Sequence, residues 1–121
     1  MTYSKILSAL TAMYGVFALA KPRHLATGIE APDVQAPAYD QMARTYAGRD
    51  LSISGLALAS SSPALVTTAM ALRIAGDLSD AAVLGLGARS SKVRTKVLAV
   101  TLGWAALNTA ALLADRRGLG R

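Results

Sequence analysis

The stretch Leu51–Leu86, with the sequence LSISGLALASSSPALVTTAMALRIAGDLSDAAVLGL, decides how this chain is organised. Its apolar run is interrupted by the serines 60–62 and by Pro63. Ser62 can cap a helix that begins at Pro63, because serine is a favoured N-cap and proline has no N–H to leave unsatisfied in the first turn. The stretch therefore predicts two helices, one ending at about Ala59 and one running from Pro63 to about Leu86.

The composition of the chain is both apolar and basic. Of its 121 residues 53% are hydrophobic and 17% are charged, the net charge is +6, and there is no Cys. A chain without Cys has no disulfide scaffold, no Cys zinc site and no thiol chemistry. The charged fraction lies below that of a typical soluble domain. The basic residues stand in short groups between apolar stretches, which favours a polytopic membrane protein over a nucleic-acid-binding one.

Apolar stretches on both sides of residues 51–86 complete the predicted organisation. We expect an all-α integral membrane four-helix bundle with spans at about 4–20, 46–60, 63–86 and 97–114. It forms a single domain over residues 1–121, with a polar loop at about 22–40. Pro37 suits the first turn of the helix that enters the membrane near Tyr46. The first stretch also has features of a signal peptide, but basic residues directly after Ala20 favour a retained helix.

A three-span alternative treats residues 51–72 as one Pro-kinked crossing. The distribution of Lys and Arg discriminates between the three-span and the four-span arrangement, because cytoplasmic loops carry an excess of positive charge. With three spans, the two sides of the membrane carry six and seven basic residues. With four spans, they carry eight and four. The eight are Lys21, Arg23, Arg44, Arg49, Arg89, Lys92, Arg94 and Lys96. Four spans are favoured, and both termini are then predicted outside the cytoplasm of a multi-pass cell-membrane protein.

The third predicted span carries three ionisable residues on one face. Arg73, Asp77 and Asp80 lie at positions i, i+4 and i+7 of this helix. Each isolated charge costs about 2.5–3.5 kcal/mol at the centre of a membrane helix, so these side chains should face other helices or a wet cavity. We expect Arg73 to pair with Asp77, and Asp80 to reach the membrane interface or Arg89.

The second predicted span adds the charged step Arg49-Asp50. Adjacent helical residues point about 100° apart, so we expect Asp50 to turn inward toward Arg73 and Arg49 to snorkel toward the loop side. The candidate catalytic residues are therefore Asp50, Arg73, Asp77 and Asp80. The candidate ligand-binding residues are Tyr14, Arg49, Ser54 and Asn108. Small residues, such as Gly55 with Ala59 and Ala71 with Ala75, should let the helices approach closely.

Two interpretations of these buried charges stay open. Buried Arg–Asp pairs can fix helix register without any chemistry. Alternatively, carboxylates beside a guanidinium in a low-dielectric bundle can hold a proton and act in acid/base catalysis or proton relay. His24 is the only histidine and has no neighbouring ligands at metal-binding spacing. The sequence predicts no metal and no cofactor.

Three segments of the chain carry a family resemblance. They are Tyr14–Arg23 (YGVFALAKPR), Gly48–Leu51 (GRDL) and Arg73–Asp80 (RIAGDLSD). In this order they resemble a family of small four-helix integral membrane proteins catalogued as domain of unknown function 4267, which is broadly similar in layout to DoxX-like proteins. The resemblance covers nearly the whole chain. It implies a four-helix membrane bundle and implies no particular activity.

The sequence indicates the membrane location of this protein more specifically than it indicates its function. We expect a non-enzymatic accessory or interaction subunit in the lipid bilayer that associates with itself or with a membrane partner protein, without nucleic acid. The alternative is a membrane-embedded isomerase, cyclase or epoxide hydrolase acting on a lipophilic small molecule, with Asp77 or Asp80 as general acid or base oriented by Arg73. A proton-coupled carrier is the third interpretation, which an unbroken set of helices disfavours.

Overall fold

All regular secondary structure in the computed structural model is helical, and the structure describes residues 1–118. The four long helices are α1 (Thr2–Ala20), α3 (Ala36–Ala59), α4 (Pro63–Leu86) and α5 (Ser91–Arg116). A short helix α2 (Arg23–Gly28) and a 3-10 turn η1 (Asp33–Gln35) connect α1 to α3. Within these residues no strand occurs, so the predicted all-α class is confirmed.

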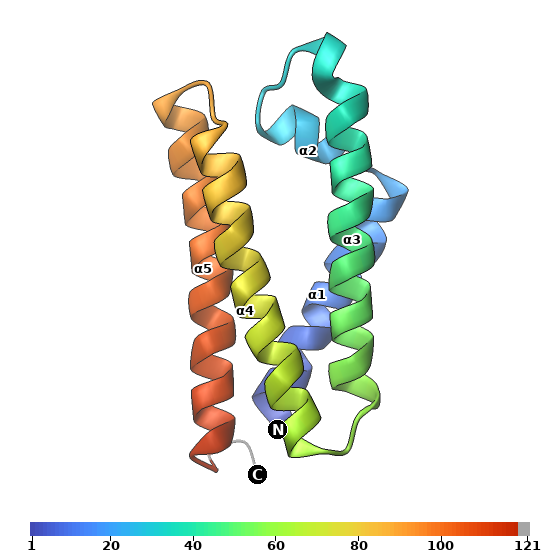
Figure 1. Ribbon diagram of the computed structural model, residues 1–121, viewed down its shortest axis with the longest axis vertical. Coiled ribbons are helices and arrows are strands. Elements are labelled where there is room, and N and C mark those ends of the chain that lie inside the picture. Colours follow the sequence, from blue (N-terminus) through green and yellow to red (C-terminus); the bar gives the residue numbers. More distant parts are fainter. Residues whose placement is uncertain (119–121) are drawn as a thin grey trace.

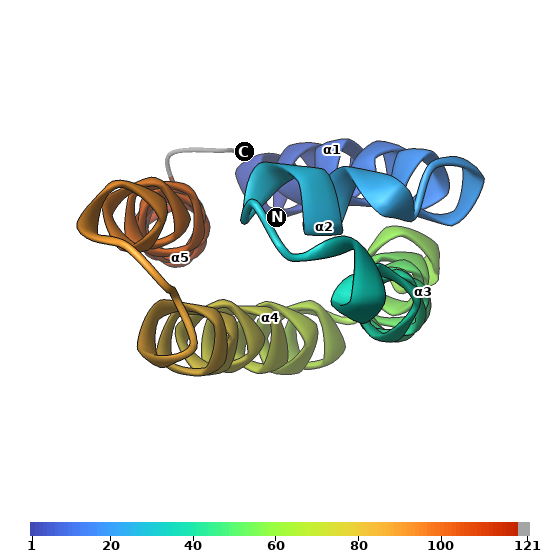
Figure 2. The same ribbon diagram turned by 90° about the horizontal axis from the view of Figure 1, so that it is seen from above.

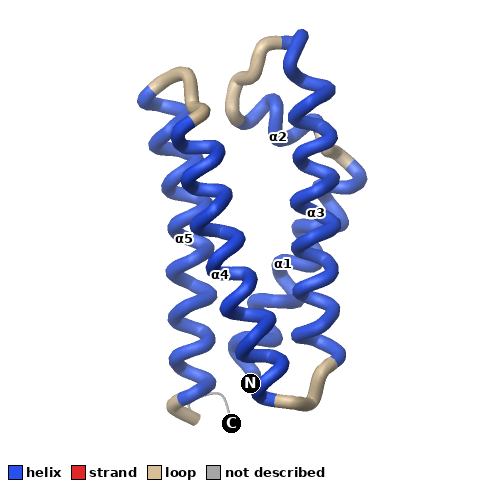
Figure 3. Tube along the Cα trace, viewed as in Figure 1, coloured by secondary structure: helices blue, strands red, loops and turns tan. Residues whose placement is uncertain are grey.

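The four long helices stand side by side and form a ring when seen from above (Figure 2). Around this ring α3 and α5 each neighbour both α1 and α4. The start of α1, the α3–α4 loop and the end of α5 lie at one end of the bundle, called here the termini end (Figure 1). The α4–α5 turn, α2 and η1 lie at the opposite end, called the α2 end (Figure 3). Helices α3 and α4 are close at the termini end and diverge toward the α2 end (Figure 1).

Serine caps set where two of these helices begin. The Ser62 hydroxyl accepts a hydrogen bond from the Leu65 N–H at 3.4 Å, and α4 runs from Pro63 to Leu86 as predicted. The Ser90 hydroxyl accepts from the Val93 N–H at 3.2 Å, so α5 begins well before the predicted boundary at residue 97. Much of the basic run therefore belongs to the first turns of α5, because a local cap decides a helix start even where the following residues are charged.

The polar segment at residues 22–40 is more ordered than the predicted loop. It contains α2 and η1, and α3 begins inside it at Ala36. Lys96 Nζ on α5 donates to the Gly28 carbonyl at the end of α2 at 2.9 Å. Such a contact satisfies one of the carbonyl groups that a helix C-terminus leaves free, which a sequence pattern cannot reveal.

At the termini end, two helices are capped by side chains from distant parts of the chain. The Asp115 carboxylate near the end of α5 accepts from the Tyr3 N–H at 3.0 Å and from the Ser4 N–H at 2.7 Å. Lys5 Nζ donates to the Ser60 carbonyl at 2.7 Å, just beyond the end of α3. These contacts place a carboxylate at a helix N-terminus and an ammonium at a helix C-terminus, the favourable arrangement for both helix dipoles.

The distribution of side chains between inside and outside is inverted relative to a water-soluble bundle. Ten of the fourteen buried apolar residues in the described chain are Ala. Seven polar or charged residues are also buried, namely Ser4, Ser8, Thr11, Ser54, Arg73, Asn108 and Asp115. By contrast, twenty large hydrophobic residues are exposed along the long helices and their connections, including Phe17, Leu72 and Val100. Soluble proteins bury such large residues and rarely expose so many of them together.

Close helix contacts use different small residues from those predicted. A Cβ at Gly15 of α1 would lie 2.9 Å from Leu51 Cγ of α3, so this glycine allows the two helices to approach. A Cβ added at Gly55 would have no atom of another residue within 4 Å, and Ala59, Ala71 and Ala75 are exposed. The predicted Gly55/Ala59 and Ala71/Ala75 contacts are therefore wrong, because these residues lie on outward faces of α3 and α4.

Two helices of the described chain, α1 and α5, are long and apolar enough to cross a membrane by length and composition. Helices α3 and α4 are of sufficient length but carry the charged residues that form the candidate site.

Candidate functional site

Six residues form a polar cluster where α3 faces α4, called here the Arg/Asp cluster. Its members are Arg49, Asp50, Ser54, Arg73, Asp77 and Asp80. The strongest link is between Arg49 of α3 and Asp80 of α4, whose two hydrogen bonds measure 2.9 Å from Nη1 to Oδ1 and 2.8 Å from Nη2 to Oδ2. Such a two-point contact between a guanidinium and a carboxylate fixes the relative position of the two helices.

Arg49 also contacts residues of its own helix. Its Nη2 donates to Asp50 Oδ1 at 3.1 Å, and its guanidinium carbon lies 4.9 Å from the centre of the Tyr46 ring. The predicted snorkelling of Arg49 toward the loop side is therefore wrong. The guanidinium reaches across to α4 beside Gly76, where a Cβ would lie 3.4 Å from Arg49 Cζ, an ordinary contact distance.

Arg73 is 3% exposed and lies deeper in the bundle than Arg49. Its Nη2 donates to Ser54 Oγ at 2.7 Å and to the backbone carbonyl of Asp50 at 3.2 Å. The predicted ion pairs of Arg73 with Asp77 and with the Asp50 carboxylate do not occur among the described residues. The hydroxyl and carbonyl oxygens of α3 take their place, which sequence spacing along α4 alone could not indicate.

Three atoms of the cluster are buried without a hydrogen-bond partner in the described chain. They are Nε and Nη1 of Arg73 and Oδ2 of Asp77. Asp80 pairs with Arg49, so the predicted contact of Asp80 with Arg89 is also wrong. The cluster is therefore only partly paired, and its unpaired donors and acceptor lie on the α4 side. Unpaired buried polar atoms are rare in folded proteins and call for a water, an ion or a ligand group.

Two candidate ligand-binding residues have their hydrogen-bond partners outside this cluster. The Tyr14 side chain is 51% exposed, and its Oη is 2.6 Å from His24 Nε2. The His24 Nδ1 lies 2.9 Å from the Lys21 carbonyl, to which it donates, so Nε2 accepts from the tyrosine hydroxyl. Asn108 is fully buried and donates to the Trp104 carbonyl of its own helix at 2.8 Å. No hydrogen bond in the described chain joins Tyr14 or Asn108 to the Arg/Asp cluster.

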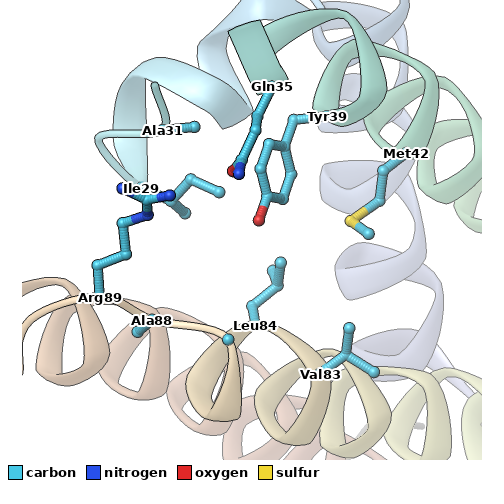
Figure 4. Close-up of a pocket in the computed structure, with 10 residues that line it drawn as sticks. Ile29, Ala31, Gln35, Tyr39, Met42, Val83, Leu84, Ala88 and Arg89 are labelled. Atoms are coloured by element: carbon cyan, nitrogen blue, oxygen red, sulfur yellow. The ribbon is translucent and has the colours of Figure 1, made fainter. Parts of the chain in front are cut away.

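A cavity of about 300 Å³ lies at the α2 end, between the start of α3 and the end of α4. Figure 4 shows three polar side chains around it, Gln35, Tyr39 and Arg89. Its apolar wall includes Met42, Val83 and Leu84. On α4, Asp80 precedes Val83 and Leu84 by about one turn, so the Arg/Asp cluster begins next to the inner wall of this cavity. The sequence did not indicate this cavity, since its residues come from two distant stretches, 29–42 and 83–89.

Outside the predicted spans, one ion pair attaches α2 to α3. Arg23 donates from Nε and Nη2 to the Asp40 carboxylate, with its Nη2 at 2.9 Å from Oδ2. The hydrogen bonds from Arg23 hold the pKa of the Asp40 carboxyl below its usual value. Because this pair is at the surface, it orients α2 more than it stabilises the fold.

The described residues contain no group of three or more His, Cys, Asp or Glu side chains that could hold a metal ion. What the Arg/Asp cluster offers chemically is one carboxylate oxygen on Asp77 and the N–H donors of two guanidinium nitrogens, Nε and Nη1 of Arg73, in a partly closed interior. These groups can accept and donate hydrogen bonds to a polar group that enters the bundle.

Comparison with known proteins identifies no relative: no family model, no curated protein and no solved structure matches this chain.

Proposed function

We propose that this chain is an integral membrane protein whose four long helices all cross the bilayer. The observation that supports this most strongly is the inverted side-chain distribution, with alanine and polar residues inside and twenty large hydrophobic residues outside. In lipid, helices associate through small residues and hydrogen bonds, while large apolar side chains face the hydrocarbon. The same distribution in water would expose far more apolar surface than a soluble monomer tolerates.

The charges of α3 and α4 are compatible with crossing because they face each other. Arg49 is paired with Asp80 and Asp50, and Arg73 is hydrogen-bonded to Ser54. Ionisable residues inside membranes are tolerated when they face the bundle interior and pair with one another. The α2 end then faces the cytoplasm, because it carries the larger group of basic residues, and both termini lie outside.

Within the membrane, the protein acts as a non-enzymatic accessory subunit. Two of the three carboxylates in the Arg/Asp cluster, those of Asp50 and Asp80, are engaged by Arg49. This pairing supports a structural role for most of the cluster. The exposed apolar faces are available to a second copy of the chain or to a membrane partner protein as well as to lipid.

Membrane fractionation tests the proposal. The chain, expressed with an epitope tag, should remain in the pellet when isolated membranes are washed with alkaline carbonate, which releases proteins bound only at the surface. Release into the supernatant together with a peripheral control protein would refute the four-span proposal.

One observation favours a second candidate function, a membrane-embedded enzyme acting on a lipophilic substrate. Asp77 has a buried oxygen without a partner, one turn from the partly unpaired Arg73. In this case Asp77 serves as general acid or base and Arg73 orients the reacting group. Asp77→Asn should then abolish turnover without loss of folded protein, whereas a purely structural cluster predicts that no activity depends on this carboxylate.

A further inference from the structure

We propose that the cavity at the α2 end binds a single-chain amphiphile with an anionic head group, such as a medium-chain carboxylate. This inference deepens the proposed function and rests on it for the way the ligand arrives, which is from the bilayer. It concerns a site separate from the Arg/Asp cluster, with its own polar and apolar groups.

The polar side of the cavity is complementary to an anion. Figure 4 shows the Tyr39 hydroxyl and the Gln35 amide directed toward the same space, with the Arg89 side chain across from them. None of the ten residues that line the cavity is acidic, and Arg89 gives it a positive charge. Within residues 1–118, the side chains of these three residues make no hydrogen bond or ion pair, so their donors are available to a carboxylate. A guanidinium with a hydroxyl and an amide donor is a favourable setting for such a group.

The apolar side of the cavity is suited to a hydrocarbon chain. Met42 of α3 and Val83 and Leu84 of α4 form this wall, on the side nearer the Arg/Asp cluster. The polar groups of the cavity lie at the α2 end, together with Ile29 and Ala31, whereas the side toward the middle of the bundle is apolar. A single-chain amphiphile lying in a membrane has this same polarity along its length.

The volume of the cavity selects a small ligand. One water-sized group takes about 30 Å³ in the liquid, so a cavity of about 300 Å³ holds about ten non-hydrogen atoms. This is the lower end of the range for small-molecule sites. Octanoate has a matching size, whereas a two-chain phospholipid is several times too large to enter completely.

The experiment measures binding of radiolabelled octanoate to the purified full-length chain, in lipid nanodiscs, with empty nanodiscs subtracted. If carbonate extraction shows the chain to be soluble, the same measurement is made in buffer, so failure of the membrane proposal and failure of this one are distinguished. We expect saturable binding that unlabelled octanoate competes and that neither octyltrimethylammonium nor inorganic phosphate competes. If phosphate competed as well as octanoate, the site would recognise an anion alone and not an amphiphile, which would overturn the proposal.

Two variants locate the site, and a third serves as their control. Arg89→Gln should weaken octanoate binding by about tenfold, because it removes the charged partner of the carboxylate. Ala88→Phe should abolish binding by filling the cavity. Lys92→Gln removes one charge from the same basic run without lining the cavity, and should bind like the wild type. Wild-type affinity in both Arg89→Gln and Ala88→Phe, or equal loss in Lys92→Gln, would overturn the proposal.

Discussion

Arg49 and Asp80 form a two-point contact of 2.8 and 2.9 Å between α3 and α4, the helix pair that diverges toward the α2 end. This contact joins α3 to α4 through a charged pair. It also leaves Asp77, one turn away on α4, as the carboxylate in the Arg/Asp cluster that Arg49 does not engage. The contact therefore gives the two acidic residues of α4 different roles: Asp80 is structural and Asp77 has a free acceptor.

Asp80→Asn should lower the free energy of unfolding by about 1–3 kcal/mol, because it removes the ionic part of this contact and leaves Arg49 partly unpaired. Denaturation of the purified protein in mixed micelles measures the change. Asp77→Asn is the matched control on the same helix and should change stability much less. Equal destabilisation by the two variants would contradict the different roles assigned to these residues.

Asp115→Ala should destabilise the protein by about 1 kcal/mol, since the Tyr3 and Ser4 N–H groups then lose the carboxylate that caps α1. The same micelle denaturation measures this loss. Asp115→Asn keeps one acceptor oxygen and should recover part of the difference. If Asp115→Ala were as stable as the wild type, the capping contact across the termini end would have no energetic role.

Gly15→Ala should destabilise the protein by about 1–3 kcal/mol, because the added Cβ would lie 2.9 Å from Leu51 Cγ and force α1 away from α3. A second substitution, Leu51→Ala, should relieve the overlap, so the double variant should be more stable than the sum of the two single effects predicts. Gly55→Ala is the control, since nothing lies within 4 Å of its Cβ position. It should leave stability unchanged or raise it by up to about 1 kcal/mol.

Protonation of Asp40 should break the ion pair between α2 and α3 at low pH. Hydrogen bonds from Arg23 lower the pKa of Asp40 in the folded protein, so the ion pair contributes fully above the unfolded pKa of about 3.9. The contribution is lost as the pH falls through the lower folded pKa. The Tm of the wild type should therefore exceed that of Asp40→Asn at neutral pH, and the difference should disappear in acid. A difference that does not depend on pH would contradict this assignment.

The parts of the fold that depend on local sequence could be predicted, and contacts between distant segments could not. The start of α4 follows from Ser62 and Pro63, whose capping roles involve neighbouring residues alone. The partner of Arg49 depends instead on the rotation of α3 relative to α4, which brings Asp80 to its guanidinium. Likewise Asp115 and Ser4 are 111 residues apart, and no local pattern connects them.

The candidate site was predicted in its composition but not in its pairing. Arg49, Asp50, Ser54, Arg73 and Asp80 lie together between α3 and α4. The cost of lone charges in lipid predicted an inward position for Asp50 and Arg73, but Arg49 was expected toward the loop side and Asp80 at the interface or Arg89. Arg73 nevertheless binds Ser54 in place of a carboxylate, since a hydroxyl on the facing helix was nearer than any acidic side chain. Tyr14 points toward His24, because α2 folds back over the end of α1, and this return of the chain has no signature in the sequence.

The location of the C-terminus tests the central claim, four membrane crossings, most directly. A reporter pair that is active on opposite sides of the membrane can be fused after Arg121 and, in a separate protein, inserted in the α4–α5 turn beside Arg89. Four crossings predict that the reporter after Arg121 is active outside the cytoplasm and that the reporter beside Arg89 is active inside it. A cytoplasmic signal from the fusion after Arg121 would contradict the four-span topology with both termini outside.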